Sequence, residues 1–352
     1  MAKAGFTLDN CRGCVRSTSK EAGWVLCAGA GISLPVFPLW NEITNRLLNW
    51  RNKDPVTSTD FSELTTKLSL DSLVQAVFHE KNLPPYNFAQ GLSRILYEDL
   101  KARCKADWNF ISRLLALPHF GDVTKQQAEA FLTFFYDHYN TCSSLRIAEI
   151  IGRSIVQKHA PSAVLSFNVE PLLFAMLNAY IKVNTQLPPK KLFDVSLRGI
   201  SYRSKERIAY YHCHGLLPQP GLKIGKNAAS LDKLVFTESE YLNLAGSMFS
   251  WQSAVFLQAA FSHCIVFVGL SFSDPNLRRW LGFVHANRVQ ELKDIGEKVK
   301  DSTQHYWINR KPDSKRQQAW VEAAVAHLGV RLVWINQWEE IGAVLKRMLS
   351  LK

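Results

Sequence analysis

The strongest constraint on the fold is an alternation of short apolar runs with longer segments of helical spacing. Each run spans only a few residues, which is typical of buried parallel strands. The segments between them repeat apolar residues about every 3.6 positions, as amphipathic helices do. This order predicts an α/β fold, a Rossmann-like parallel sheet with helices on both faces. The runs are Gly23–Ala28, Ala163–Phe167, Ile208–Cys213, His263–Gly269, His305–Asn309 and Val330–Ile335.

Between about residues 60 and 160 the strand signal disappears and helical spacing takes over. Loop residues such as Leu83-Pro84-Pro85 separate the expected helices. We therefore expect one domain over residues 21–352 with a helical insertion module at about 60–160. Residues 1–20 are polar, and we expect them to form a loose N-terminal extension. The expected helices of the module are Ser69–Glu80, Tyr86–Cys104, Thr124–Tyr139 and Ser144–Gln157.

Composition favours a folded protein in the cytoplasm, without membrane association. The chain has 352 residues, of which 47% are hydrophobic, and no apolar run is long enough to span a bilayer. The segment Met1–Cys14 has no apolar signal core. The seven cysteines are scattered, and the CxxC at Cys11 and Cys14 lacks a second ligand pair, so no metal is expected.

The net charge is +12, and much of the excess of basic residues falls between Lys182 and Lys233. A basic face attracts a dinucleotide pyrophosphate, a nucleic acid or an acidic partner. The charge alone does not choose among them, so direct binding of nucleic acid stays open.

Polar or glycine-rich segments follow four of the expected strands, where an α/β sheet binds its ligands. The first is Gly29-Ala30-Gly31-Ile32-Ser33. Glycines there let the backbone turn tightly and approach a phosphate, and Ser33 adds a hydroxyl donor. A tight turn without any ligand is the alternative, because the full GxGxxG pattern is missing.

The second and third segments are Ser166-Phe167-Asn168-Val169-Glu170 and His212-Cys213-His214-Gly215. Asn168 has a donor and an acceptor to orient a ribose hydroxyl or a water, although an Asn at such a junction often caps a helix. Strand alternation puts His212 and His214 on one face. We favour His214 as a general base because it lies nearer the strand tip, the alternative being a core or surface histidine.

The fourth segment runs from Gly269 through Ser271 to Asn276. Asp274 before Pro275 is a typical helix N-cap, with proline at the first helical position. Gly269 and Ser271 remain candidates for contacting a ligand.

In this order and spacing, the four segments resemble the sirtuin-like family, in particular its prokaryotic branch of NAD-hydrolysing anti-phage defence effectors. The resemblance runs from about Trp24 to Leu351. It also includes Pro38-Leu39-Trp40, the stretch from Phe236 to Tyr241, and the stretch from Val268 to Pro275.

The resemblance implies an NAD+ glycohydrolase that cleaves the nicotinamide–ribose bond to give nicotinamide and ADP-ribose. By analogy, Asn168 holds the nicotinamide ribose or the attacking water, and His214 acts as the base on the ribose hydroxyls. Other positions would bind the rest of NAD, which is a substrate here, and no metal is expected. The pyrophosphate would contact Gly29, Ala30, Gly31 and Ser33, and the adenosine half Gly269, Ser271 and Asn309.

Protein-deacylating sirtuins carry a four-cysteine zinc module, which this chain lacks. The chain also has Glu170 where the family usually has Asp, and no Asp-Phe-Arg follows the glycine turn. An NAD-dependent protein deacylase and a non-catalytic nucleotide-binding assembly subunit are the alternatives.

An NAD hydrolase that is always active is toxic, so this activity has to be gated. The expected catalytic domain uses nearly all of the chain. We therefore expect sensing to lie in a separate activator protein from the same operon or in homo- or hetero-oligomeric assembly. The sequence does not distinguish linear from cyclic product, or NAD from NADP.

Overall fold

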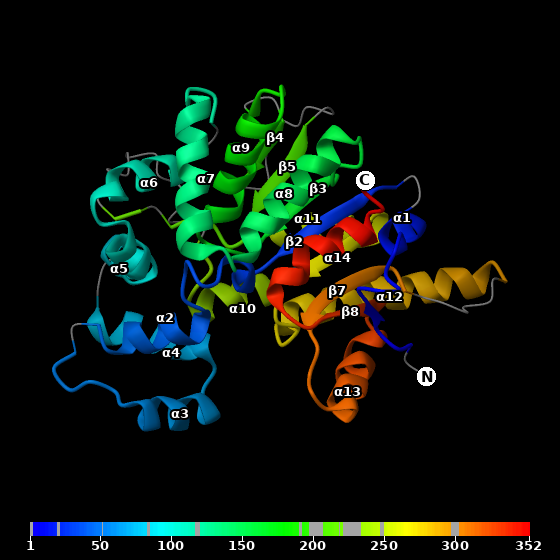
Figure 1. Ribbon diagram of the computed structural model, residues 1–352. Coiled ribbons are helices and arrows are strands. Elements are labelled where there is room, and N and C mark those ends of the chain that lie inside the picture. Colours follow the sequence, from blue (N-terminus) through cyan, green and yellow to red (C-terminus); the bar gives the residue numbers. More distant parts are fainter. Residues whose placement is uncertain are drawn as a thin grey trace.

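The fold is built around one parallel sheet, whose labelled strands run from β4 to β8 in Figure 1. The computed structural model describes residues 3–19, 22–50, 52–82, 85–116, 120–189, 192–196, 207–217, 219–220, 234–246, 250–296 and 303–352. Much of the basic segment Lys182–Lys233 lies outside the described residues.

Eight strands form the sheet in the order β1-β8-β7-β6-β2-β3-β5-β4, and every pairing among them is parallel. This confirms the predicted Rossmann-like α/β fold. The strands are β1 (Phe6–Thr7), β2 (Trp24–Ala28), β3 (Ala163–Ser166), β4 (Phe193–Ser196), β5 (Ile208–His212), β6 (Cys264–Val268), β7 (His305–Arg310) and β8 (Val330–Ile335).

The central strand β2 shows why these residues form a sheet covered on both faces. Trp24, Leu26 and Ala28 join the hydrophobic cluster on one face, whereas Val25 and Cys27 join the cluster on the other. Side chains alternate between the two faces of a strand, so an uninterrupted apolar run buries both faces.

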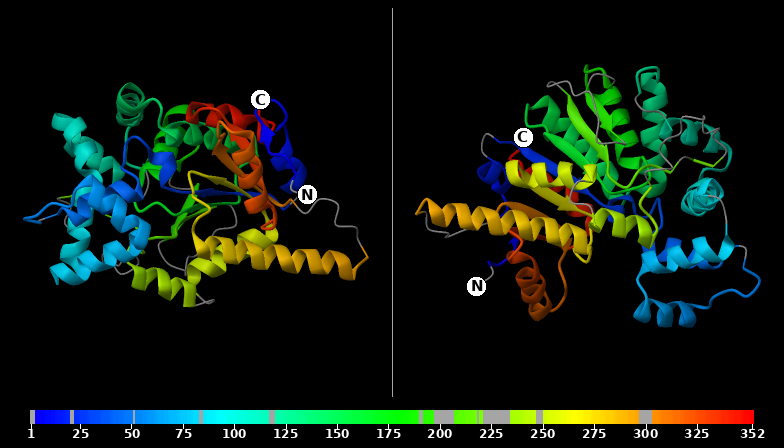
Figure 2. Two further views of the ribbon diagram at one scale, coloured as in Figure 1. Left: turned by 90° about the horizontal axis from the view of Figure 1, so that it is seen from below. Right: turned by 180° about the vertical axis from the view of Figure 1, so that it is seen from behind.

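Two sets of helices cover the sheet, one on each face (Figures 1 and 2). Their buried side chains divide cleanly between the two hydrophobic clusters. The first face carries α1 (Cys14–Ser19), α8 (Ser143–Val156), α9 (Leu172–Asn184) and α14 (Ile341–Met348). The second face carries α11 (Trp251–Ser262), α12 (Pro275–Asp294) and α13 (Lys315–Ala326).

The helices between β2 and α8 lie largely beside the sheet, at the left of Figure 1. Among them, α7 packs against α9, and α2 packs against α4 and α5. The division of the chain at residues 60 and 160 stays a prediction. These helices are α2 (Trp40–Leu48), α3 (Ser58–Lys67), α4 (Leu70–Lys81), α5 (Pro85–Cys104), α6 (Trp108–Leu115) and α7 (Lys125–Tyr139).

The N-terminal residues differ from our expectation of a loose extension. Within the described part, β1 pairs with β8, and Cys11, Cys14 and Val15 are buried in the first hydrophobic cluster. The segment is polar on average, but its few apolar side chains are enough to pack it against the sheet and its first hydrophobic cluster. Burial also raises the pKa of the Cys14 thiol to about 12.

None of the helices within the described ranges combines the length and apolar character needed to cross a membrane.

Candidate functional site

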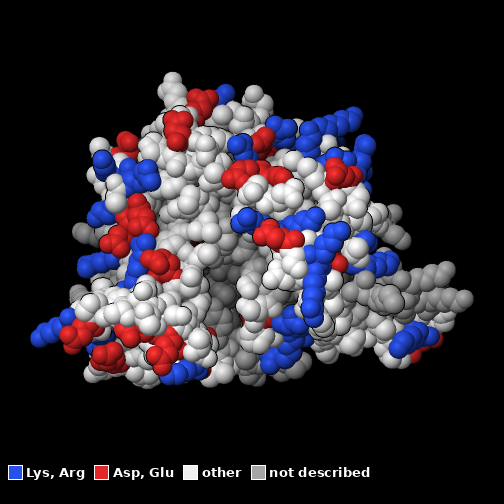
Figure 3. Space-filling view, turned by 60° about the horizontal axis from the view of Figure 1, so that its bottom comes forward, with Lys and Arg blue, Asp and Glu red and all other residues white. Residues whose placement is uncertain are grey.

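The candidate site lies at the carboxyl ends of the central strands. In the sheet, β2 has β3 on one side and β6 on the other, and the chain crosses from one half to the other around β2. Ligands of open α/β sheets bind at such a switch point. Figure 3 shows the surface on this side of the molecule hollowed near its centre.

The glycine turn after β2 packs against the loop that follows β6. The amide of Gly29 donates to the Val268 carbonyl oxygen at 3.0 Å, and the amide of Gly31 donates to the Gly269 carbonyl oxygen at 2.9 Å. A Cβ on Gly29 would lie 2.5 Å from Leu270 Cδ2. These glycines therefore allow two loops to meet, and these two amides are already used within the protein.

Gly269 itself needs to be glycine for two reasons. Its φ is +66°, a left-handed conformation that disfavours other residues, and a Cβ there would lie 2.6 Å from the amide nitrogen of Ile32. The carbonyl oxygen of Ile32 accepts a hydrogen bond from Ser144 Oγ of α8 at 2.9 Å. The short helix η1 (Ala30–Ser33) is thereby held from both sides.

Ser33, Asn168 and Glu170 form a buried cluster of hydrogen bonds, although Ser33 comes from the glycine turn and the other two follow β3. Ser33 Oγ donates to Glu170 Oε1 at 2.5 Å. The side-chain nitrogen Nδ2 of Asn168 donates to the same Glu170 oxygen at 2.7 Å and to Ser33 Oγ at 3.1 Å. The structure therefore brings two of the predicted site residues, Ser33 and Asn168, into direct contact.

The remaining polar atom of Asn168 is its Oδ1, which is buried and has no hydrogen-bond partner within the described protein. The orientation of the amide is fixed, because a carboxylate accepts from the Nδ2 side and repels Oδ1. A buried acceptor without a partner costs about 1–3 kcal/mol. Asn168 thus offers a preoriented acceptor to a donor such as a hydroxyl group or water.

Asn168 does not cap the following helix. The N-cap position of α9 is Pro171, and Glu170 Oε2 accepts from the amide of Leu172 at 2.5 Å. The carboxylate thus serves the first turn of α9 and leaves Asn168 for the cluster. Burial raises the pKa of Glu170, although its hydrogen bonds from Ser33, Leu172 and Asn168 oppose that rise.

The two candidate histidines have different surroundings. Strand β5 ends at His212, so the predicted alternation does not reach His214, which lies in the turn before Gly215. His212 is 1% exposed, and its ring lies 5.0 Å from that of Tyr210. His214 is half-buried between the rings of Phe167 and Tyr241, at 5.0 and 5.6 Å.

Loss of hydration lowers the pKa of both histidines to about 4. Each is therefore neutral at pH 7 and able to accept a proton. Only His214 lies beyond the strand end and is partly exposed, which is the arrangement that a general base requires.

Tyr241 connects His214 to the helices beside the sheet. It belongs to α10 (Glu238–Gly246), which contacts α4. Ser72 Oγ of α4 donates to Glu238 Oε1 at 2.7 Å, and the amide of Ser239 donates to Gln75 Oε1 at 3.1 Å. The Tyr241 ring beside His214 is therefore carried by a helix that α4 contacts.

The other predicted residues also follow or end strands at the carboxyl end of the sheet. Ala30 is exposed on η1. Ser271, exposed after β6, hydrogen-bonds Ser273 at 2.7 Å. Asn309, near the end of β7, accepts from the amide of Arg310 at 2.8 Å. The prediction that Asp274 caps α12 is confirmed, since its carboxylate accepts from the amides of Asn276 and Leu277.

Within the part of the chain that the structure describes, no group of three or more His, Cys, Asp or Glu side chains could hold a metal ion. Cys11 and Cys14 are both free and buried.

Sequence reasoning missed the roles of Glu170, Tyr241 and Ser144. Glu170 stands two residues after Asn168, so its position in the sequence could have indicated a role in the site. Its contact with Ser33 could not be predicted, because Ser33 is distant in the sequence. Tyr241 and Ser144 are remote in sequence, and only the fold brings them to His214 and the glycine turn.

The comparisons with known proteins agree with this picture over part of the chain. No curated protein matches the sequence. Residues 184–328, less than half of the chain, match a family described as the SIR2-like domain; they include His214, Gly269, Ser271 and Asn309 but not the glycine turn or Asn168. This similarity supports a sirtuin-like family for the protein.

Proposed function

We propose that the protein is an NAD glycohydrolase, which breaks the nicotinamide–ribose bond and releases nicotinamide and ADP-ribose. The observation that carries the proposal is the Oδ1 of Asn168 at the carboxyl end of β3, which is buried and has no hydrogen-bond partner among the described residues. The neutral His214 lies at the end of the neighbouring strand β5. The SIR2-like match over residues 184–328 supports NAD as the ligand.

The residues fit the needs of this reaction. The C1′–N bond breaks with its electron pair going to nicotinamide, which leaves as a neutral molecule, and the ribose passes through an oxocarbenium-like state. Asn168 Oδ1 would accept a hydrogen bond from a ribose hydroxyl or from the attacking water. Water oxygen adds to C1′, and His214 would take the proton that a hydroxyl or the water gives up.

The glycine turn and the loop after β6 would form the floor for the rest of the substrate. Exposed Ala30 and the loop with Ser271 would face the pyrophosphate and adenosine. Because the amides of Gly29 and Gly31 donate to the carbonyl oxygens of Val268 and Gly269, a phosphate has to find its donors elsewhere at this end of the sheet.

The direct test is to incubate the purified full chain with NAD and measure nicotinamide and ADP-ribose. Asn168→Ala and His214→Ala should each lower the rate of nicotinamide release by at least about 100-fold, the usual range for a positioned acid or base. His138→Ala is the matched control, because His138 is exposed on α7 and bonds only its own helix among described residues. A fully active His214→Ala chain would refute the base assignment.

We further propose that the activity is gated, as expected of a defence effector that depletes NAD in the cytoplasm. The support is the contact from α4 through α10 to His214, which lets an assembly partner on the neighbouring helices act on the base. The NAD assay is therefore repeated with the proteins encoded beside this one. Adding an acyl-lysine peptide tests the deacylase alternative. NAD binding without nicotinamide release under every condition would instead favour the assembly subunit.

A further inference from the structure

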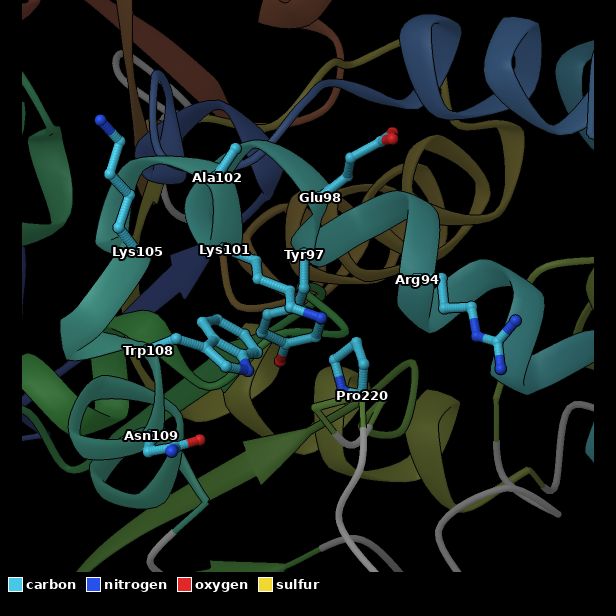
Figure 4. Close-up of a pocket in the computed structure, with 9 residues that line it drawn as sticks. All are labelled: Arg94, Tyr97, Glu98, Lys101, Ala102, Lys105, Trp108, Asn109 and Pro220. Atoms are coloured by element: carbon cyan, nitrogen blue, oxygen red, sulfur yellow. The ribbon is translucent and has the colours of Figure 1, made fainter.

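Outside the candidate site, α5 and α6 border a cavity of about 590 Å³ (Figure 4). This volume lies within the roughly 300–1,000 Å³ that small-molecule sites occupy. Arg94, Tyr97 and Lys101 line it from α5, Trp108 lines it from α6, and Pro220 closes one side. It shares no lining residue with the Ser33–Asn168–Glu170 cluster or with His214.

The charge that faces this cavity is positive. Arg94 and Lys101 are exposed, and neither has a carboxylate partner among the residues that the structure describes. Glu98 also lines the cavity, but its carboxylate lies 3.7 Å from Arg46 Nη1. In Figure 4 the side chains of Glu98, Lys105 and Arg94 point away from Trp108, whereas that of Lys101 points in among the other lining residues. Unpaired Arg and Lys side chains beside a cavity are suited to phosphate oxygens.

The aromatic part of the cavity is fixed in place. The ring of Tyr97 meets that of Trp108 edge to face, with centroids 6.2 Å apart. Tyr97 is fully buried, and its hydroxyl donates to the Leu217 carbonyl oxygen at 3.2 Å. Trp108 stays partly exposed, so its indole offers a supported surface on which a planar ring can stack.

From this combination we propose that the cavity binds a nucleoside phosphate, with the base against Trp108 and the phosphate against Lys101, while Arg94 adds positive charge at the rim. An acidic peptide would pair with the cationic side chains but leave the Trp108 indole without a stacked ring. An uncharged ring would stack on the indole but leave the cations without an anion. This binding site is separate from the proposed NAD cleavage site and does not depend on it.

The cavity wall continues toward the candidate site. Leu217, which accepts from Tyr97, donates its own amide to the Val169 carbonyl oxygen at 2.7 Å. Val169 stands between Asn168 and Glu170. A ligand in the cavity would therefore lie beside Tyr97, which is linked through Leu217 to the segment that carries Asn168.

Photolabelling of the full chain with 8-azido-ADP tests the proposal, because peptide mapping then reports where the ligand lies. We expect label in peptides spanning residues 94–109, and competition by unlabelled ADP. Adenosine and ribose 5-phosphate should each compete at least about tenfold more weakly, since each lacks one half of the ligand. Lys101→Glu should reduce this label at least about tenfold, which corresponds to the roughly 1.4 kcal/mol of one charge-assisted contact.

Lys315→Glu is the matched control, an identical charge change at an exposed position of α13, and it should leave the label unchanged. Three outcomes would each overturn the proposal. They are label found only at the carboxyl end of the sheet, label in Lys101→Glu equal to that in the unchanged protein, and competition by an acidic peptide as strong as that by ADP. A 5′-phosphorylated oligonucleotide that competes better than ADP would support the same chemistry at the end of a nucleic acid strand. Nicotinamide release by the Lys101→Glu chain is measured as well. The label reports on the cavity, whereas nicotinamide release reports on the proposed hydrolase activity, so failure of one can be told from failure of the other.

Discussion

Glu170 organises the candidate site although it was noticed in the sequence only as a departure from the sirtuin pattern. One of its oxygens accepts from both Ser33 and Asn168, and the other accepts from the amide of Leu172. These three hydrogen bonds stabilise the charged form and so oppose the rise in the pKa of Glu170 that burial causes. An Asp has a side chain one methylene shorter and would have to move its backbone to meet the same donors. The longer side chain is therefore consistent with this particular cluster.

The sequence placed Asn168 at the end of a strand but left its role open between helix cap and ligand contact. A local pattern cannot decide this, because Pro171, Glu170 and Asn168 all stand close to the start of α9. The hydrogen bond to Ser33 decides it, and Ser33 lies 135 positions earlier in the chain. Long-range contacts of this kind are set by packing and not by local residue preference.

The lowered pKa of His214 predicts the pH dependence of the proposed reaction. In the unfolded chain a histidine protonates near pH 6.5, whereas folded His214 does so near pH 4. The base is therefore neutral, and active, at all pH values well above 4. We expect kcat/KM for NAD to change less than about threefold between pH 8 and pH 5.5, and its acid limb to fall near pH 4.

Initial rates of nicotinamide release measure this, with circular dichroism at each pH to establish that the chain is folded. The folded state loses stability as pH falls from about 6.5 toward 4, because only the unfolded chain gains the proton there. An acid limb near pH 6.5 in a fully folded sample would contradict the burial of this imidazole.

At the scale of elements, the glycine turn and the β6 loop behave as one unit. Gly29→Ala would put a methyl group 2.5 Å from Leu270 Cδ2 and 2.7 Å from the Gly269 carbonyl oxygen. We expect this substitution to lower the free energy of unfolding by about 1–3 kcal/mol, the usual cost of overpacking. Nicotinamide release should fall with it, since Ser33 belongs to the same turn.

Gly282→Ala is the control for the preceding change. Gly282 lies inside α12, and a Cβ there would approach nothing closer than Leu328 Cδ2 at 3.7 Å. Replacing a helical glycine by alanine should stabilise the protein by about 0.5–1 kcal/mol. Urea unfolding measures both variants. Equal stability of the two would show that the turn and the β6 loop are not in contact.

Most elements of the sheet were readable from the sequence because each buried strand is an unbroken apolar run. All six predicted runs correspond to strands, from β2 to β8. The two missed strands lack that signal, since β1 has only two residues and β4 contains Asp194. Both lie at the edges of the sheet, where one side of the strand has no neighbour and less burial is required.

At the scale of the whole molecule, α4 and α10 join the helices beside the sheet to the candidate site. The double substitution Ser72→Ala with Gln75→Ala removes the two hydrogen bonds between these helices that involve Glu238 and Ser239. Each bond stabilises by about 0.5–1.5 kcal/mol. We therefore expect amide hydrogens of α10 to exchange at least about tenfold faster, as measured by mass spectrometry.

Thr65→Ala provides the comparison, because among the described residues the Thr65 hydroxyl donates only to the Ser62 carbonyl oxygen, within exposed α3. It should leave α10 exchange unchanged. If the double substitution also leaves exchange unchanged, α4 does not hold α10, and the proposed gating route through Tyr241 loses its support.

The contact of the glycine turn with Gly269 has a consequence during synthesis. A nascent chain emerges from the ribosome with β2 and its turn long before β6, yet these two strands are neighbours in the finished sheet. Until Gly269 has emerged, the amides of Gly29 and Gly31 lack the carbonyl partners that hold them. Pairing at such sequence separation is slow and comes late in folding. Co-translational intermediates and prematurely terminated chains that end before β6 would therefore lack the partners of the glycine turn, so the proposed site would stay incomplete until synthesis has passed Gly269 of the 352 residues.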